Sequence, residues 1–193
     1  MEKVKRKKTF KSFISRISLV FAAVAIFLTL TGTILWFSVD YDLDLNGIEN
    51  ISARNVFYDN SGNEINAKGN GRFIEFSEFK DYTINCFVST EDKNFFKHNG
   101  IDLKRMTKAA AKNAASFSYK EGASTITQQL IKNSQLTSEK TLKRKFKEIK
   151  LALKLEKELS KTRIMELYLN SIYFGKNCYG IENASKCYFI RHN

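Results

Sequence analysis

An uncharged stretch near the N-terminus is the strongest constraint on what this chain can form. From Ile17 to Val39 no residue is charged, a run of 23 positions. At about 1.5 Å per residue, a helix of this length extends roughly 35 Å, which is enough to cross a hydrocarbon core of about 30 Å. A cleaved signal peptide is the competing interpretation, but its apolar region usually has only about 7–15 residues. The run therefore favours a membrane-spanning helix over residues 17–39.

The charges that flank this run predict its orientation. Seven basic residues and one acidic residue precede it, and three aspartates follow within residues 40–44. Because basic flanks stay on the cytoplasmic side, residues 1–16 are expected to form a cytoplasmic tail, with the rest of the chain outside the cell membrane. The tail supplies half of the formal net charge of +12. The argument for a nucleic-acid partner, which such a charge would otherwise support, is weaker for that reason.

The composition narrows the class of the remaining chain. With 43% hydrophobic and 13% aromatic residues, it is not a disordered protein. Three cysteines and two histidines exclude a disulfide scaffold and disfavour a structural zinc site. Cys178 and Cys187 are able to pair, but packing of the cysteines as small apolar residues is the preferred interpretation.

Turn residues and helical patterns divide the chain beyond the apolar run. Residues 40–76 are expected to form a linker with a short β hairpin, in which residues 56–58 and 64–65 flank an Asn- and Gly-containing turn. From Ser77 onward the pattern is helical, and the chain contains no proline to interrupt it. The sequence thus predicts a mainly α domain over residues 77–193.

Two polar segments of this domain are candidates for a site. Ser89 or Thr90 is expected to cap a helix that carries Glu91 and Asp92 in its first turn, where the helix dipole keeps a carboxylate charged and suited to act as a base. Ordinary capping is the simpler alternative for this pair. A second helix is expected from Asp102 to residue 115.

The second polar segment follows Gly122. Hydroxyl, amide and ammonium side chains crowd residues 124–133, and a helix that starts in this way presents hydroxyls and free N–H groups to an anion. A capped surface helix is the alternative. Gln128 and Gln129 make it less convincing, because solvated helix faces usually carry Lys and Glu.

The helix expected over residues 139–159 has more than one face. At 100° per residue, Leu142, Phe146 and two further apolar residues form a stripe predicted to face the core, and six lysines form a basic face. Arg144 and Glu148 lie on a second apolar flank. The pair could form a surface salt bridge that contributes a few tenths of a kcal/mol. Because the basic residue precedes the glutamate, which is the weaker order for such a bridge, we interpret the pair as part of a site.

Five ordered blocks across residues 91–184 resemble glycosyltransferase family 51, the peptidoglycan polymerase domain of penicillin-binding proteins and monofunctional transglycosylases. The blocks are Glu91-Asp92-x-x-Phe95-x-x-His98-x-Gly100; Gly122-x-Ser124-Thr125-Ile126-Thr127-Gln128-Gln129-Leu130 with Lys132-Asn133; Arg144-Lys145-x-x-Glu148; Lys161-x-x-Ile164-x-Glu166-x-Tyr168-x-Asn170; and Tyr173-Phe174-Gly175 with Tyr179-Gly180-Ile181 and Ala184. The second block is highly specific. Relative to the family pattern, the chain looks shortened at its C-terminal end.

The resemblance implies a fold, a reaction and a set of roles. The fold would be a lysozyme-like, mainly α domain, and the reaction would join lipid-linked glycan to lipid II with inversion, releasing undecaprenyl pyrophosphate. Glu91 would be the general base and Glu148 the second catalytic carboxylate. The residues implied in substrate binding are Asp92, Phe95, His98, Ser124, Thr125, Gln128, Gln129, Lys132, Asn133, Arg144 and Lys145.

The implied partners are lipid II, the lipid-linked glycan chain and the membrane. Binding to cell-wall synthesis proteins stays an open question, and no nucleic-acid partner is expected. No metal site is predicted, although a divalent cation, Mg²⁺ or Mn²⁺, at the pyrophosphate stays open. Three other functions remain as alternatives: a shortened, inactive chain that binds lipid II or a partner, a basic nucleic-acid binder, and a lysozyme-like hydrolase.

Overall fold

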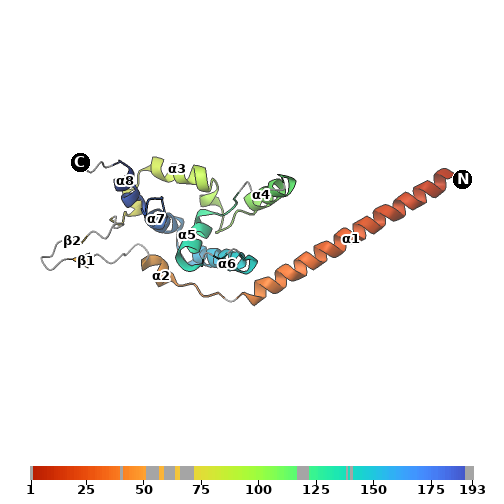
Figure 1. Cartoon of the computed structure of the whole chain (residues 1–193), viewed down its shortest axis with the longest axis horizontal. Coiled ribbons are helices and arrows are strands. Elements are labelled where there is room, and N and C mark those ends of the chain that lie inside the picture. Colours follow the sequence, from red (N-terminus) through yellow and green to blue (C-terminus); the bar gives the residue numbers. More distant parts are fainter. Residues whose placement is uncertain are drawn as a thin grey trace. The chain divides into compact units, whose positions relative to one another are not determined.

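The structure is a computed structural model that describes residues 2–39, 41–50, 57–58, 64–65, 72–116, 122–137, 139 and 141–189, with the side chains of the first helix described from residue 15. The chain divides into two compact units, Met1–Asp40 and Tyr41–Asn193. Figure 1 shows the elements of both units along the chain.

The first unit is a single long helix, α1 (Glu2–Ser38). Its segment Ser15–Ser38 has 24 residues, a mean hydropathy of 2.3 and no buried residue, so it is long and apolar enough to cross a membrane. The hydroxyl groups within it donate to carbonyl oxygens one turn earlier, as Thr31 Oγ1 does to the Phe27 carbonyl at 2.9 Å. Such bonds satisfy hydroxyl groups that would lack water in a bilayer.

The region predicted as a linker contains a helix in addition to two short strands. Strands β1 (Phe57–Tyr58) and β2 (Glu64–Ile65) pair antiparallel. Before them, α2 (Leu45–Asn50) buries Ile48 completely in the core of the second unit, where α2 packs against α5 (Ile126–Gln135). The Gln135 amide also donates to the Asp44 carbonyl oxygen at 2.5 Å. The start of this region therefore belongs structurally to the helical domain.

The helical domain is built around α5. This helix packs against α6 (Leu142–Glu158) and α7 (Lys161–Ser171) (Figure 1). The three helices supply most of the fully buried apolar side chains. The mainly α class predicted from the sequence is confirmed. The remaining elements are η1 (Phe76–Glu78), α3 (Asp81–Glu91), η2 (Phe95–Lys97), α4 (Leu103–Ser116) and α8 (Ile181–Phe189).

The predicted start of a helix before Glu91 is wrong, because Glu91 is the last residue of α3 and Asp92 is its C-cap. The helix begins ten residues earlier, after the N-cap residue Lys80. Polar residues just before a carboxylate pair resemble an N-cap in the sequence, but here Thr90 Oγ1 donates back to the Cys86 carbonyl oxygen at 2.8 Å, as it does inside a helix.

The predicted core stripe of α6 is also wrong. Leu142 is 73% exposed, whereas Leu151, Ala152 and Leu155 are fully buried on the flank that carries Arg144 and Glu148. A helix with two apolar flanks does not reveal by angle alone which one its neighbours will cover. Here the buried flank is the one that contains the candidate site residues.

The cysteines depart from the preferred expectation too. Cys178 and Cys187 form a disulfide with a Cα–Cα distance of 6.7 Å, and Cys86 is a free, exposed cysteine. The disulfide joins α8 to the turn that precedes it, in which Tyr173 and Tyr179 form an isolated β-bridge.

Candidate active site

Glu91 lies where three helices meet. Its carboxylate, at the end of α3, accepts a hydrogen bond from Gln129 Nε2 of α5 at 2.8 Å. The amide oxygen of Gln129 in turn accepts a hydrogen bond from the hydroxyl of Tyr168, on α7, at 3.2 Å. Because that oxygen faces a donor, the amide nitrogen is directed at Glu91. Burial raises the pKa of the Tyr168 phenol, and the carboxylates of Glu91 and Asp92 raise it further, so the phenol keeps its proton.

Glu148 is the second carboxylate, and it is almost completely buried, with 1% of its surface exposed. It accepts a hydrogen bond from Gln128 Nε2 at 3.2 Å and one from the ammonium group of Lys145. Arg144 Nη1 lies 3.7 Å from its other oxygen. A buried carboxylate needs partners of this kind to remain charged. The adjacent residues Gln128 and Gln129 therefore each hold one of the two candidate catalytic carboxylates.

The cations around Glu148 face the start of α5. Lys145 Nζ also donates to Ser124 Oγ at 3.0 Å, which links the first turn of α6 to the segment that precedes α5. Within the described residues, Arg144 Nε and Nη1 are buried and have no hydrogen-bond partner. Guanidinium donors that lack a hydrogen-bond partner, beside an ammonium group and a hydroxyl, form an arrangement that can bind phosphate oxygens.

Three other predicted substrate-binding residues are packed inside the domain. Asp92 is completely buried, and its Oδ2 accepts hydrogen bonds from the backbone N–H of Ile126 at 3.1 Å and from His98 Nε2 at 2.9 Å. Phe95 is completely buried in the core, with Lys161 Nζ 4.3 Å from the centre of its ring. Asp92 thus fixes the end of α3 to the start of α5, His98 holds the Asp92 carboxylate, and Phe95 packs in the core beside Lys161 of α7. Their role toward a substrate stays a prediction.

Thr125 has a similar internal position. As the N-cap of α5 it accepts from the Gln128 N–H at 3.1 Å, and the Gln128 side chain accepts from the Thr125 N–H at 3.1 Å. The Thr125 hydroxyl donates to the Gly100 carbonyl oxygen at 2.6 Å. Gly100 has a φ of +92°, and a Cβ there would lie 2.8 Å from the Ala152 carbonyl oxygen, so only glycine brings this loop close to both α5 and α6.

Lys132 and Asn133 are the predicted residues that the structure does not bring into this group. Both are exposed in the C-terminal half of α5. No hydrogen bond or ion pair joins either of them to Glu91 or Glu148 in the part of the chain that the structure describes. Their predicted contact with a substrate stays a prediction.

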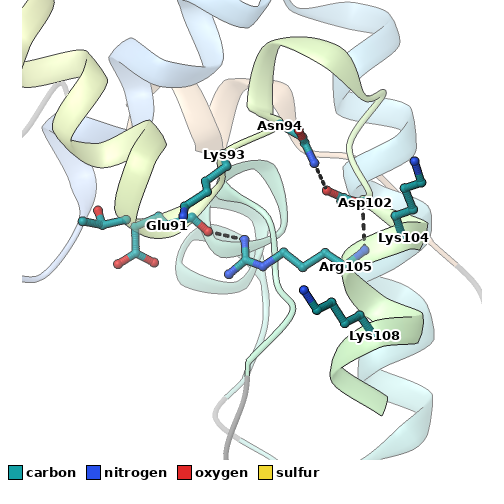
Figure 2. A pocket seen from close by; sticks show the side chains of 8 residues that line it. Glu91, Lys93, Asn94, Asp102, Lys104, Arg105 and Lys108 are labelled. Carbon is teal, nitrogen blue, oxygen red and sulfur yellow. Dashed lines mark hydrogen bonds between the residues drawn. The ribbon is translucent and has the colours of Figure 1, made fainter. Parts of the chain in front are cut away.

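A cleft of about 540 Å³ beside Glu91 contains residues that the sequence interpretation missed. Figure 2 shows Arg105 extending from α4 toward the backbone of Glu91, whose carbonyl oxygen accepts its hydrogen bond. Asp102, at the start of α4, accepts from Asn94 and from the Arg105 N–H, and these bonds lower the pKa of its carboxyl group. The available sequence signal was the pair of lysines at positions 104 and 108, which lie on one helix face. The full lining is Thr90, Glu91, Lys93, Asn94, Asp102, Lys104, Arg105 and Lys108.

Among the described residues, no three or more His, Cys, Asp or Glu side chains come together as a possible metal site. A divalent cation at the pyrophosphate stays a prediction.

Comparison with known proteins identifies the family of the chain. Residues 59–193, more than two thirds of the chain, match the family model described as Transglycosylase. The chain is 48% identical over 120 residues to penicillin-binding protein 1A of Aquifex aeolicus (strain VF5), a match that covers 62% of this chain and 16% of that protein. It is 44% identical over 139 residues to penicillin-binding protein 1A of Neisseria gonorrhoeae, covering 71% and 17%.

A third relative is similar over almost the whole chain. Penicillin-binding protein 1F of Bacillus subtilis (strain 168) is 36% identical over 192 residues, which are 98% of this chain and 26% of the relative. The chain thus corresponds to about a sixth to a quarter of the length of these three proteins. On the family match and these identities, the chain belongs to the transglycosylase family.

Proposed function

We propose that this chain polymerises lipid II into β-1,4-linked glycan strands, with inversion at the anomeric carbon and release of undecaprenyl pyrophosphate. The observation that carries the proposal is the pair of neighbouring glutamines on α5, which hold Glu91 and Glu148. This arrangement combines a partly exposed carboxylate with a second, buried carboxylate that is surrounded by cations.

The reaction needs a base on the face of the donor sugar opposite the leaving group. Glu91 would take the proton of the acceptor's 4-hydroxyl while that oxygen forms a bond to the anomeric carbon of the donor. The bond from this carbon to the phosphate oxygen breaks, and the pyrophosphate leaves with the electron pair. Arg144 and Lys145 would stabilise the charge that develops on it. Cations of this kind favour a phosphate leaving group over the neutral glycan of a hydrolase substrate.

The first unit of the chain fits a substrate that is attached to lipid. The apolar helix Ser15–Ser38 would anchor the chain in the cell membrane, with the N-terminus in the cytoplasm and the helical domain outside. A lipid-linked acceptor and a lipid-linked donor would then both be confined to the surface on which the enzyme is held.

The test uses the full chain in detergent with labelled lipid II. Replacing Glu91→Gln keeps the size of the side chain and removes the base, so polymer formation should fall at least about a hundredfold while lipid II binding changes little. Glu158→Gln, at an exposed carboxylate at the end of α6, is the matched control and should polymerise normally.

Equal loss of binding and polymerisation in the Glu91→Gln protein would contradict a base role. A folded wild-type chain that binds lipid II and forms no polymer would favour the alternative of a binding protein without activity.

A further inference from the structure

The flank of α6 that does not face the core carries an apolar stripe. Leu142 is 73% exposed. The other members of the stripe are only partly buried: Phe146, Ile149 and Leu153. At 100° per residue these three lie within about 40° of Leu142, on the side of the helix opposite to the flank that holds the candidate site. Within the described part of the chain, none of the four belongs to the hydrophobic core.

Lysines run along one side of this stripe. Lys143 is exposed, Lys147 and Lys154 are partly exposed, and none of them forms an ion pair with another described residue. Two of the three acidic residues of α6, Glu148 and Glu156, have buried side chains with cationic partners, and the third is its last residue. The outward charge of the helix is therefore mainly cationic. An apolar stripe beside a row of lysines is typical of helices that lie in the surface of a membrane.

The beginning of the second unit lies on the same face of α6. Its first residue is Tyr41, and the ammonium nitrogens of Lys150 and Lys154 are 4.7 and 6.0 Å from the centre of the Tyr41 ring. Tyr41 is three residues beyond Ser38, the last residue of α1, and three residues of chain reach at most about 10 Å. If α1 crosses a membrane, the chain therefore connects this face of α6 to the lipid surface by a very short segment.

We propose that the outer face of α6 docks on the membrane surface. The apolar stripe enters the boundary between headgroups and acyl chains, and the lysines beside it bind anionic headgroups. Both features of the face select this occupant. A nucleic acid would match the lysines but leave the apolar stripe in water, and an apolar groove of a protein would leave the lysines unmatched.

The docked face adds a second contact to the membrane anchor. One spanning helix holds a domain near the bilayer but does not orient it, whereas a second contact fixes which side of the domain faces the lipid. The proposal rests on the anchor that is part of the proposed function, and it does not depend on polymerisation.

The experiment places a tryptophan on this face and measures its quenching by brominated lipids. The full chain is used in vesicles, with Trp36→Phe so that α1 gives no signal. Leu142→Trp reports on the stripe, and Tyr82→Trp on α3 is the matched control, because Leu142 is 73% and Tyr82 76% exposed. Interfacial helices enter the bilayer by about 5–10 Å, so lipids brominated near the glycerol end of the acyl chain should quench Leu142→Trp at least about threefold more strongly than Tyr82→Trp.

A second comparison tests the lysines. Lys143→Gln/Lys147→Gln is combined with Leu142→Trp and compared with Lys80→Gln/Lys97→Gln, which removes the same charge at exposed positions outside α6. The vesicles contain phosphatidylcholine with phosphatidylglycerol, at the salt concentration that halves the quenching of the parent chain. Each lysine near an anionic surface contributes about fivefold, so the ratio of docked to free protein should fall roughly ten- to thirtyfold in the α6 variant and less than about twofold in the control. In phosphatidylcholine alone, the two pairs should differ less than about twofold.

Equal quenching of Leu142→Trp and Tyr82→Trp would refute docking of this face. Strong quenching that depends neither on the lysines nor on phosphatidylglycerol would refute the binding of anionic headgroups. Both measurements are made without lipid II, so their outcome is separate from the proposed function. A chain that forms no polymer from lipid II, but whose Leu142→Trp is quenched as expected, would refute the polymerase activity and leave the membrane contact in place.

Discussion

Replacing Asp92 by alanine should destabilise the helical domain far more than it weakens substrate binding. Asp92 has no exposed surface, and one of its oxygens accepts hydrogen bonds from both the Ile126 N–H and His98 Nε2. Alanine would remove both bonds and leave two donors without a partner in the interior. It would also remove a negative charge from the N-terminus of α5, where the helix dipole favours one.

The magnitude follows from these contacts. A hydrogen bond to a charged group contributes about 1.5–3 kcal/mol, and removing one partner of a buried polar pair costs about 3–5 kcal/mol in total. For a domain of this size, that loss corresponds to a fall in the melting temperature of roughly 6–20 °C. Asp92→Asn keeps the shape and one acceptor, so it should cost about 1–2 kcal/mol.

The assay is thermal unfolding of the full chain in detergent, followed by near-UV circular dichroism of its tyrosines and phenylalanines. Tryptophan fluorescence would not report on this domain, because the single tryptophan, Trp36, lies in α1. Asp42→Ala, at an exposed aspartate, is the control. If the Asp92→Ala protein melted within about 2 °C of the wild type and bound lipid II more than tenfold more weakly, Asp92 would be a substrate ligand and the argument from burial would be wrong.

Two further predictions concern the groups around the base. Tyr168→Phe should lower kcat about three- to tenfold with little change in KM for lipid II. The reason is that the amide of Gln129 loses the hydroxyl donor that directs it toward Glu91. An unchanged kcat in steady-state polymerisation assays would contradict this. Asp102→Asn should destabilise the domain at neutral pH, where the carboxylate is charged and bonded. Because folding lowers the pKa of this carboxyl group, the carboxylate stabilises the folded domain above a pH of about 4, and this contribution is lost as the pH falls further. The free energies of unfolding of wild type and variant, measured by denaturant unfolding, should therefore converge in acid.

The sequence predicted the existence of the helices better than their ends and faces. Asp102 lies at the expected start of α4, where its carboxylate accepts the Arg105 N–H, because capping depends on a few neighbouring residues. The start of α3 and the buried face of α6 were predicted wrongly, since both depend on which elements pack against these helices. Local pattern contains no information about those partners.

The candidate site shows the same division. The sequence suggested Glu91, Glu148 and the two glutamines as site residues, and their catalytic and binding roles stay predictions. It did not indicate which amide would bond which carboxylate. It missed Arg105, whose bonds go to carbonyl oxygens that any residue supplies. When a side chain donates to a distant backbone oxygen, the residue type at the accepting position gives no sign of the contact.

The two adjacent glutamines of α5 have a consequence for how the site responds to change. Since Gln128 and Gln129 are neighbours on one rigid helix, any rotation or shift of α5 displaces the partners of both carboxylates together. The same motion would therefore change the alignment of the group that removes the proton from the incoming sugar and of the groups that stabilise the departing phosphate. The position of one helix would then control both proton removal and leaving-group stabilisation. A substitution that moves either end of α5 would affect the surroundings of both carboxylates.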